Sequence, residues 1–144
     1  MGRILSLDIG EVRIGLAIGD ITNQFALPYD VIKRRPEKLA FEKLKEIVKK
    51  NDVEKIIVGL PLKTDGTIGT QAESTINFCD KLKNEIPIPI EMYDERFSSK
   101  IAEDLLIKDG MRRENRKKVQ DKIASAIILQ SYLDSNAQKK DKSN

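Results

Sequence analysis

Residues 3–19 have the sequence RILSLDIGEVRIGLAIG, and they are the most informative part of the chain for its fold. Residues 3–9 form a run of β-branched and aliphatic side chains, which predicts a strand. Residues 13–19 alternate apolar with small residues and predict a second strand. Only residues 10–12 separate the two runs, which is the length of a hairpin connection. We therefore expect the chain to open with two antiparallel strands.

The pattern continues with a third strand and then changes to alternating helices and strands. A strand is expected at 25–32, where Pro28 favours an edge position. Apolar residues at helical spacing predict amphipathic helices at 36–51 and 70–84. The runs KIIVGL (55–60) and IPIEMY (88–93) predict strands. Two further helices are expected, one from Ser98 or Ser99 to residue 108 and one at about 117–134.

These elements predict an α/β fold with a five-stranded mixed sheet and helices on both faces. The first three strands form an antiparallel meander, and two parallel βα units follow, because strand–helix–strand crossovers are right-handed. We expect residues 1–134 to form a single domain and residues 135–144 to be a disordered C-terminal tail.

The composition excludes several kinds of chemistry. The 144 residues include one cysteine, Cys79, and no histidine. An intramolecular disulfide, a cysteine-based zinc site, a Ser-His-Asp triad and imidazole metal ligands are therefore excluded. Asp8 interrupts the first apolar run, so no signal peptide is expected, and no stretch approaches a membrane span. We expect a cytoplasmic protein without a membrane partner.

Three polar features are expected to meet at one edge of the sheet. Asp8 ends the first strand, the 61–69 loop follows the fourth, and Asp94 and Glu95 follow the fifth. Sites in such sheets form beyond the carboxyl ends of the parallel strands. Each acid also has a simpler explanation: Asp8 as a turn residue, Asp94-Glu95-Arg96 as a neutralised strand end, Asp121 as an acid near a helix start.

Carboxylates that gather at one edge are suited to bind hard divalent cations. Mg²⁺ prefers oxygen ligands, and a pair of such ions can hold both the attacking water and the leaving oxygen of a phosphodiester. Asp8, Asp121 and one of the neighbours Asp94 and Glu95 could form this site. The residues alone do not decide between the two neighbours.

Four blocks of the sequence resemble the motifs of the YqgF/RuvX family in the family's order. They are LSLDIGEVRIGLAIGD (5–20), IVGLPLKTDGTIG (57–69), YDERFSSKIAEDLL (93–106) and QDKIASAIILQSYL (120–133). The resemblance implies an RNase H-like fold with Mg²⁺ or Mn²⁺, two ions, held by the catalytic acids Asp8, Glu95 and Asp121. Ser125 stands where the family has a second alanine, and Ser98-Ser99 where it has a pair of threonines.

Basic residues around this edge are candidate contacts for nucleic-acid phosphates. The segment 112–122 is locally basic, although a solvated helix start would explain its charge equally well. Arg13 and Arg96 could instead pair with Asp20 or Asp94. The candidate contacts are Arg13, Lys63, Arg96, Arg112, Arg113, Arg116, Lys117 and Lys118.

The family resemblance implies a metal-dependent nuclease that hydrolyses phosphodiester bonds, with structured RNA and the end of pre-16S ribosomal RNA as the favoured substrate. A Holliday junction resolvase acting on four-way DNA is the alternative, and it requires a symmetric dimer. The chain is expected to be a monomer or a homodimer. A non-catalytic nucleic-acid-binding regulator remains a third hypothesis. Asp8-Ile9-Gly10 also resembles the phosphate loop of actin-like ATPases, which need a second copy of the fold.

Overall fold

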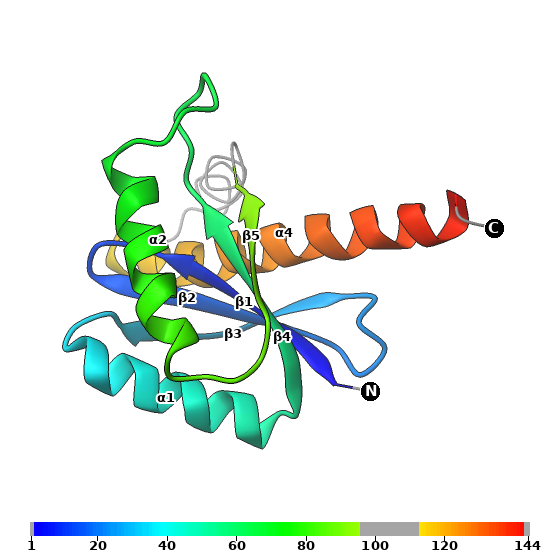
Figure 1. The fold of residues 1–144 in the computed structure, drawn as a ribbon, viewed down its shortest axis with the longest axis horizontal. Coiled ribbons are helices and arrows are strands. Elements are labelled where there is room, and N and C mark those ends of the chain that lie inside the picture. Colours follow the sequence, from blue (N-terminus) through cyan, green and yellow to red (C-terminus); the bar gives the residue numbers. More distant parts are fainter. Residues whose placement is uncertain (1, 96–112, 143–144) are drawn as a thin grey trace.

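The computed structural model describes residues 2–95 and 113–142, with the backbone alone for 113–119 and 137–142. Residues 98–108, for which the sequence predicts a helix, lie outside the described part of the chain. Figure 1 shows the described strands and helices. The strands are β1 (Arg3–Ile9), β2 (Arg13–Gly19), β3 (Ala26–Lys33), β4 (Val53–Leu60) and β5 (Ile90–Asp94), and the helices are α1 (Glu37–Lys50), α2 (Thr70–Lys83) and α4 (Arg113–Lys142).

The strands form one mixed sheet in the order β3-β2-β1-β4-β5. The pairs β1/β2 and β2/β3 are antiparallel, whereas β1/β4 and β4/β5 are parallel. This arrangement confirms the predicted meander and the two parallel crossover units. The carboxyl ends of β1, β4 and β5 consequently lie at the same edge of the sheet.

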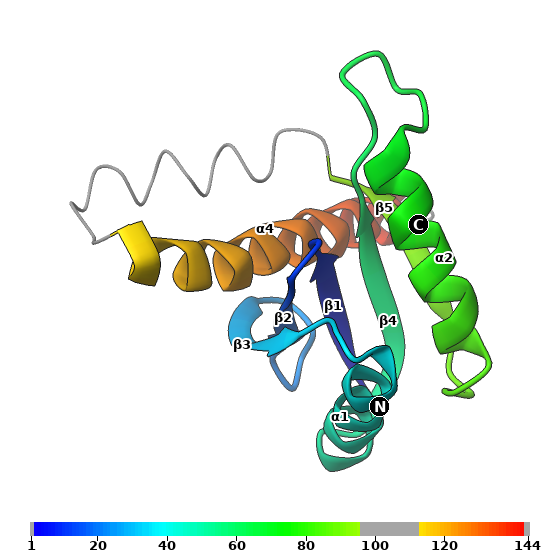
Figure 2. The ribbon, with the colours of Figure 1, turned by 90° about the vertical axis from the view of Figure 1, so that its left-hand side faces the viewer.

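Helices cover both faces of the sheet, as expected (Figure 2). Alternate residues of β1 point to opposite faces. Leu5, Leu7 and Ile9 belong to the apolar cluster that contains residues of α1 and α2. Ile4 belongs to a second cluster, which contains residues of α4, and Ser6 and Asp8 have the same parity in the strand as Ile4. The strand thus presents two polar residues to the α4 side.

Helix α4 is longer than the sequence analysis predicted, and both expected boundaries are wrong. It begins at Arg113 rather than at 117, and it continues to Lys142 through residues that we expected to be part of a disordered tail. The physical reason is that residues 113–142 contain no glycine or proline and include many Lys, Gln and Ala residues, which have high helix propensity. Asp121 is therefore the ninth residue of α4, too far from the helix start for the dipole interaction considered above.

None of the described helices is both long enough and apolar enough to cross a bilayer. Cys79 is buried on the inner side of α2 with its thiol unpaired.

Candidate active site

Asp8 is the last residue but one of β1 and lies next to Gly15 of β2 in the antiparallel register. Its side chain lines a pocket of about 280 Å³ at the carboxyl edge of the sheet. Pro61, which follows β4, and Glu95, which follows β5, line the same pocket, as does the start of α2. The convergence of polar features predicted at this edge is therefore present for Asp8 and Glu95.

The Glu95 side chain extends over β4 to contact Asp8, at a point where β4 has no side chain. Neighbouring strands lie ~4.8 Å apart, so β1 and β5 are separated by about twice that distance, with β4 between them. The Glu95 amide continues the pairing beyond β5 by donating to the Leu60 carbonyl at 3.3 Å. A Cβ placed on Gly59 would overlap the Glu95 carboxylate. The glycine therefore leaves the space in which this side chain lies.

Asp8 and Glu95 are hydrogen-bonded to each other, and both carboxyl groups have raised pKa values. Burial, followed by the negative charge of Asp8, raises the pKa of Glu95 well above its ordinary value. Burial also raises the pKa of Asp8, which the hydrogen bond from Glu95 partly offsets, and Asp121 adds a further repulsion. The directions of these effects identify protonated Glu95 as the donor and the Asp8 carboxylate as the acceptor.

Asp121 lies close to this pair but its carboxylate is engaged elsewhere. The backbone carbonyl of Asp121 lies directly over Gly15, where a Cβ would overlap it. This close approach allows the charge of Asp121 to raise the pKa of Asp8. The Asp121 carboxylate accepts a hydrogen bond from Arg13 Nε at 2.8 Å in an ion pair that is about one third exposed.

The donor chemistry of the pair fits a hard divalent cation. Two carboxylates whose ionisation is opposed by burial and by each other would be stabilised by a bound positive charge. Within residues 2–95 and the described side chains of α4, no three acidic or cysteine residues are arranged to hold a metal ion. The described site thus consists of a preformed pair, Asp8 and Glu95, while the Asp121 carboxylate is paired with Arg13.

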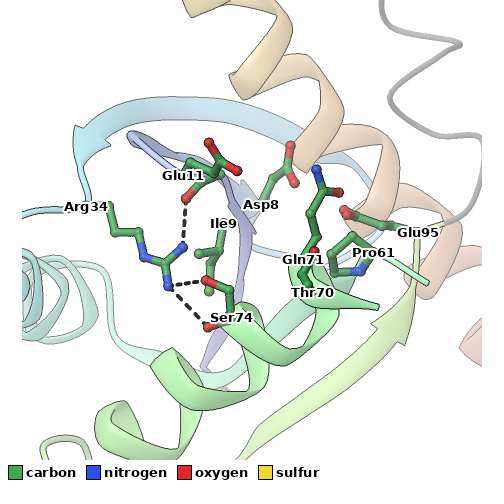
Figure 3. A pocket seen from close by; sticks show the side chains of 10 residues that line it. Asp8, Ile9, Glu11, Arg34, Pro61, Thr70, Gln71, Ser74 and Glu95 are labelled. Carbon is green, nitrogen blue, oxygen red and sulfur yellow. Dashed lines mark hydrogen bonds between the residues drawn. The ribbon is translucent and has the colours of Figure 1, made fainter. Parts of the chain in front are cut away.

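The opposite wall of the pocket is formed by the first turn of α2 (Figure 3). Thr70, Gln71 and Ser74 line the pocket there, with Ser74 bonded to Arg34, and Gly69 precedes the helix without a side-chain cap. The amino end of a helix carries a partial positive charge that attracts phosphate groups. The pocket therefore combines acidic groups on the sheet edge with an anion-attracting wall.

The predicted phosphate contacts are distributed unevenly. Arg13 pairs with Asp121, not with the Asp20 or Asp94 partners considered from the sequence. Lys63 is exposed in the β4–α2 loop, where its stem packs against Gly69. Arg96 and Arg112 lie outside the described residues. Arg113, Arg116, Lys117 and Lys118 fall in the first turns of α4, where only the backbone is described.

Two residues that shape the site were not predicted from the sequence. Arg34 is 4% exposed, and it donates to the Gly10 carbonyl at 3.0 Å and to Ser74 Oγ at 2.8 Å. It thereby joins the turn after β1 to α2, but nothing in an Arg-Arg-Pro stretch signals a buried arginine. Gly59 could have been found, because a glycine inside an apolar strand often marks a close approach.

Comparison with known proteins identifies relatives along nearly the full chain. The model of the RuvX family, described as Holliday junction resolvase, matches residues 2–135. A Clostridioides difficile protein described as "putative pre-16S rRNA nuclease" is 44% identical over 92% of this chain and 94% of its own. A Caldanaerobacter subterraneus protein with the same description is 46% identical over 92% of this chain and 96% of its own.

Solved structures support the assignment of the fold. RuvC of Thermus thermophilus, in complex with a Holliday junction substrate, has a TM-score of 0.57 at 14% identity, covering 95% of this chain and 96% of that one. The fowlpox virus resolvase, also bound to Holliday junction DNA, has a TM-score of 0.56 at 17% identity, covering 92% and 97%. The expected RNase H-like fold is thus confirmed.

Proposed function

This chain belongs to the RuvX family, and from that premise we propose that it is a metal-dependent nuclease that hydrolyses phosphodiester bonds in the end region of pre-16S ribosomal RNA. The observation that carries the proposal is the contact between Asp8 and Glu95 at the edge of the pocket. The descriptions of the relatives support the choice of RNA.

Asp8 and Glu95 are the residues that would hold the metal, as Mg²⁺ or Mn²⁺, with Asp121 as the third ligand. Two ions are expected, and when bound they supply activation of water and stabilisation of the charge at phosphorus. The chain's own groups position the substrate. The amino end of α2 and the guanidinium of Arg13 attract the phosphate backbone, while Gln71 lies beside the acids and can orient a polar group in the pocket (Figure 3).

The ion pair between Arg13 and Asp121 would have to break before Asp121 could act with the other two acids. Arg13 pairs with Asp121 while Asp8 and Glu95 are hydrogen-bonded to each other. A phosphate group is a competing partner for the guanidinium, since arginine binds phosphate oxygens as well as carboxylates. Engagement of Arg13 by substrate would free the Asp121 carboxylate to act with the other two acids.

The substrate class is tested with two labelled nucleic acids. End-labelled precursor ribosomal RNA and a synthetic four-way DNA junction are incubated with the protein in Mg²⁺, Mn²⁺ or EDTA. We expect cleavage of the RNA that requires the metal and is lost in the Asp8→Asn variant. The Glu42→Gln variant, which alters an exposed acid of α1 far from the pocket, serves as the control and should cleave normally.

Other outcomes lead to the competing functions. Cleavage of the junction without cleavage of the RNA would replace the proposal with a resolvase, which must act as a dimer to cut two strands. Salt-sensitive binding of both nucleic acids without cleavage of either would indicate a binding regulator. The expected cytoplasmic location and the monomer or homodimer state accompany the proposal and are checked by fractionation and by light scattering.

A further inference from the structure

Two buried serines join β1 to α4 beneath the acidic site. Ser6 and Ser125 are both 0% exposed. Their hydroxyl oxygens lie 2.8 Å apart. Ser6 Oγ also lies 2.9 Å from the Ser125 carbonyl, and Ser125 Oγ lies 3.0 Å from the Ser6 carbonyl. Each hydroxyl can therefore donate to the opposite segment, so the contact is reciprocal.

On β1 and on α4, the serine lies at nearly the same distance from the acid that the element carries. Ser6 precedes Asp8 by two residues, a distance of ~6.7 Å along a strand, and the two side chains share a face. Ser125 follows Asp121 by four residues, a rise of ~6.0 Å along a helix, again on one face. The two steps nearly match. Helix α4 runs opposite to β1 here, so pairing Ser6 with Ser125 brings Asp121 beside Asp8.

Other directional contacts between α4 and the sheet, from Arg13 to Asp121, from Ala26 to Gln130 and from Lys55 to Tyr132, are only partly buried. The apolar layer beyond the serines contains Ile4, Ile57, Ile128 and Leu129, and hydrophobic contact is non-directional. On the sheet side, Gly15 and Ala17 allow the helix to approach closely, but small residues only permit contact. Slippage of α4 by one turn would move Asp121 by ~5.4 Å. Directional hydrogen bonds between buried hydroxyls oppose such a displacement.

We infer that Ser6 and Ser125 are positioning residues that fix α4 on β1 in the register that places Asp121 next to Asp8. This inference rests on the proposed function, because it assigns Asp121 a place in the metal site. The serines contact neither substrate nor metal. They hold β1 and α4 together, and these two elements carry Asp8 and Asp121.

The test compares variants that remove the hydroxyls in steps. Ser6→Ala keeps the bond from Ser125 Oγ to the Ser6 carbonyl, and Ser125→Ala keeps the bond from Ser6 Oγ to the Ser125 carbonyl. The double variant removes both. Ser131→Ala is the matched control, because it deletes a hydroxyl of the same helix that bonds to Tyr93 instead.

A second control separates positioning from general loss of stability. Ile4→Val removes one methyl group from the same face of β1 without affecting a hydrogen bond. Its unfolding midpoint is measured beside those of the serine variants. A variant that is less stable but correctly aligned should retain its metal affinity.

Two measurements on the full chain give the result. Mn²⁺ affinity, followed by electron paramagnetic resonance of the free ion, should fall at least tenfold in the double variant and about threefold in either single variant. It should stay within twofold of the unaltered protein in Ser131→Ala and Ile4→Val. The helix register is followed without metal by the nuclear Overhauser effect between the Ile128 δ1 methyl and Gly59 Hα, since a Cβ on Gly59 would lie 2.7 Å from Ile128 Cδ1. That signal should weaken or split in the double variant.

Unchanged Mn²⁺ affinity in a folded double variant would overturn the inference. If the double variant does not fold, the two single variants decide: affinities equal to that of Ile4→Val would also overturn it. If the unaltered protein binds no Mn²⁺, the proposed metal-dependent function fails. The register claim is then judged by the nuclear Overhauser effect alone, whose full retention in the double variant would refute it.

Discussion

Arg13 Nε lies 2.8 Å from Asp121 Oδ2 and joins β2 to α4 across 108 residues of sequence. This pair is the counterpart of the contact between Asp8 and Glu95. One acid is paired with a guanidinium, and the other two are hydrogen-bonded to each other with raised pKa values. Both arrangements reduce the repulsion among the three acids.

Replacing the guanidinium should strengthen metal binding. In Arg13→Gln, Asp121 loses its competing cation while Asp8 and Glu95 are unchanged. A partly exposed ion pair contributes about 1 kcal/mol, which corresponds to about a fivefold change in affinity. Isothermal titration with Mn²⁺ measures the change. Arg35→Gln, which alters an exposed arginine bonded to the Glu11 carbonyl, is the control. Weaker binding in Arg13→Gln would contradict this role for Arg13.

Replacing Glu95 with a neutral residue should stabilise the metal-free protein. Glu95→Gln removes an acid whose folded-state pKa is raised, and the amide can still donate to Asp8. Because folded Glu95 retains its proton to higher pH than the unfolded chain does, its contribution to stability is full below pH ~4 and is lost as pH rises. We expect the free energy of unfolding of Glu95→Gln to exceed that of the unaltered protein by about 1–2 kcal/mol at pH 8, and to equal it near pH 4.

Urea unfolding at the two pH values in EDTA measures this difference. Asp94→Asn, at the neighbouring exposed position, is the comparison. A Glu95→Gln variant that is less stable than the unaltered protein at pH 8 would show that the acid pair is not a source of repulsion.

Metal binding should release a proton and strengthen with pH. A cation bound between Asp8 and Glu95 replaces the proton of their hydrogen bond, because ligands must be deprotonated. Below the raised pKa of Glu95, affinity for Mn²⁺ should therefore increase about tenfold per pH unit. Binding constants at pH 6, 7 and 8 provide the slope. Glu95→Gln should have a much flatter profile, and equal slopes in the two proteins would exclude Glu95 as the source of the proton.

A methyl group on Gly59 should displace Glu95. The added Cβ would overlap the Glu95 carboxylate and lie 2.7 Å from Ile128 Cδ1. Overpacking of this kind costs about 1–3 kcal/mol. We expect Gly59→Ala to fold with reduced stability and with at least tenfold weaker Mn²⁺ binding. In a double-mutant cycle, Gly59→Ala should lower the free energy of unfolding by less when Glu95 is already alanine. An equal loss of stability in both backgrounds would mean that the two residues do not compete for this space.

Local patterns were sufficient to predict most of the fold. The apolar runs in 3–9 and 55–60 and the alternation in 13–19 predicted β1, β4 and β2, because short apolar segments of this kind are typical of strands. The end of α4 was missed. The polar residues after 134 were interpreted as a disordered tail, although their helix propensity is high and no glycine or proline interrupts them.

The candidate site was predicted in its residue types but not in its geometry. The choice between Asp94 and Glu95 depends on which side chain can pass over β4, and that is decided by Gly59 in another strand. The partner of Arg13 is likewise a tertiary contact with Asp121, whereas the sequence suggested only Asp20 or Asp94. Arg34 shows the same limit, since its burial depends on the position of α2.

The most direct test of the central claim compares two adjacent acids. Cleavage of labelled precursor ribosomal RNA is measured in Mg²⁺ for the unaltered protein, Asp94→Asn and Glu95→Gln, with an EDTA reaction for each. Asp94 is exposed at the end of β5, whereas Glu95 contacts Asp8 in the pocket. We expect metal-dependent cleavage that survives in Asp94→Asn and falls at least a hundredfold in Glu95→Gln. Cleavage in Glu95→Gln at the unaltered rate, or cleavage that persists in EDTA, would disprove the proposed role of Glu95 in a metal-dependent reaction.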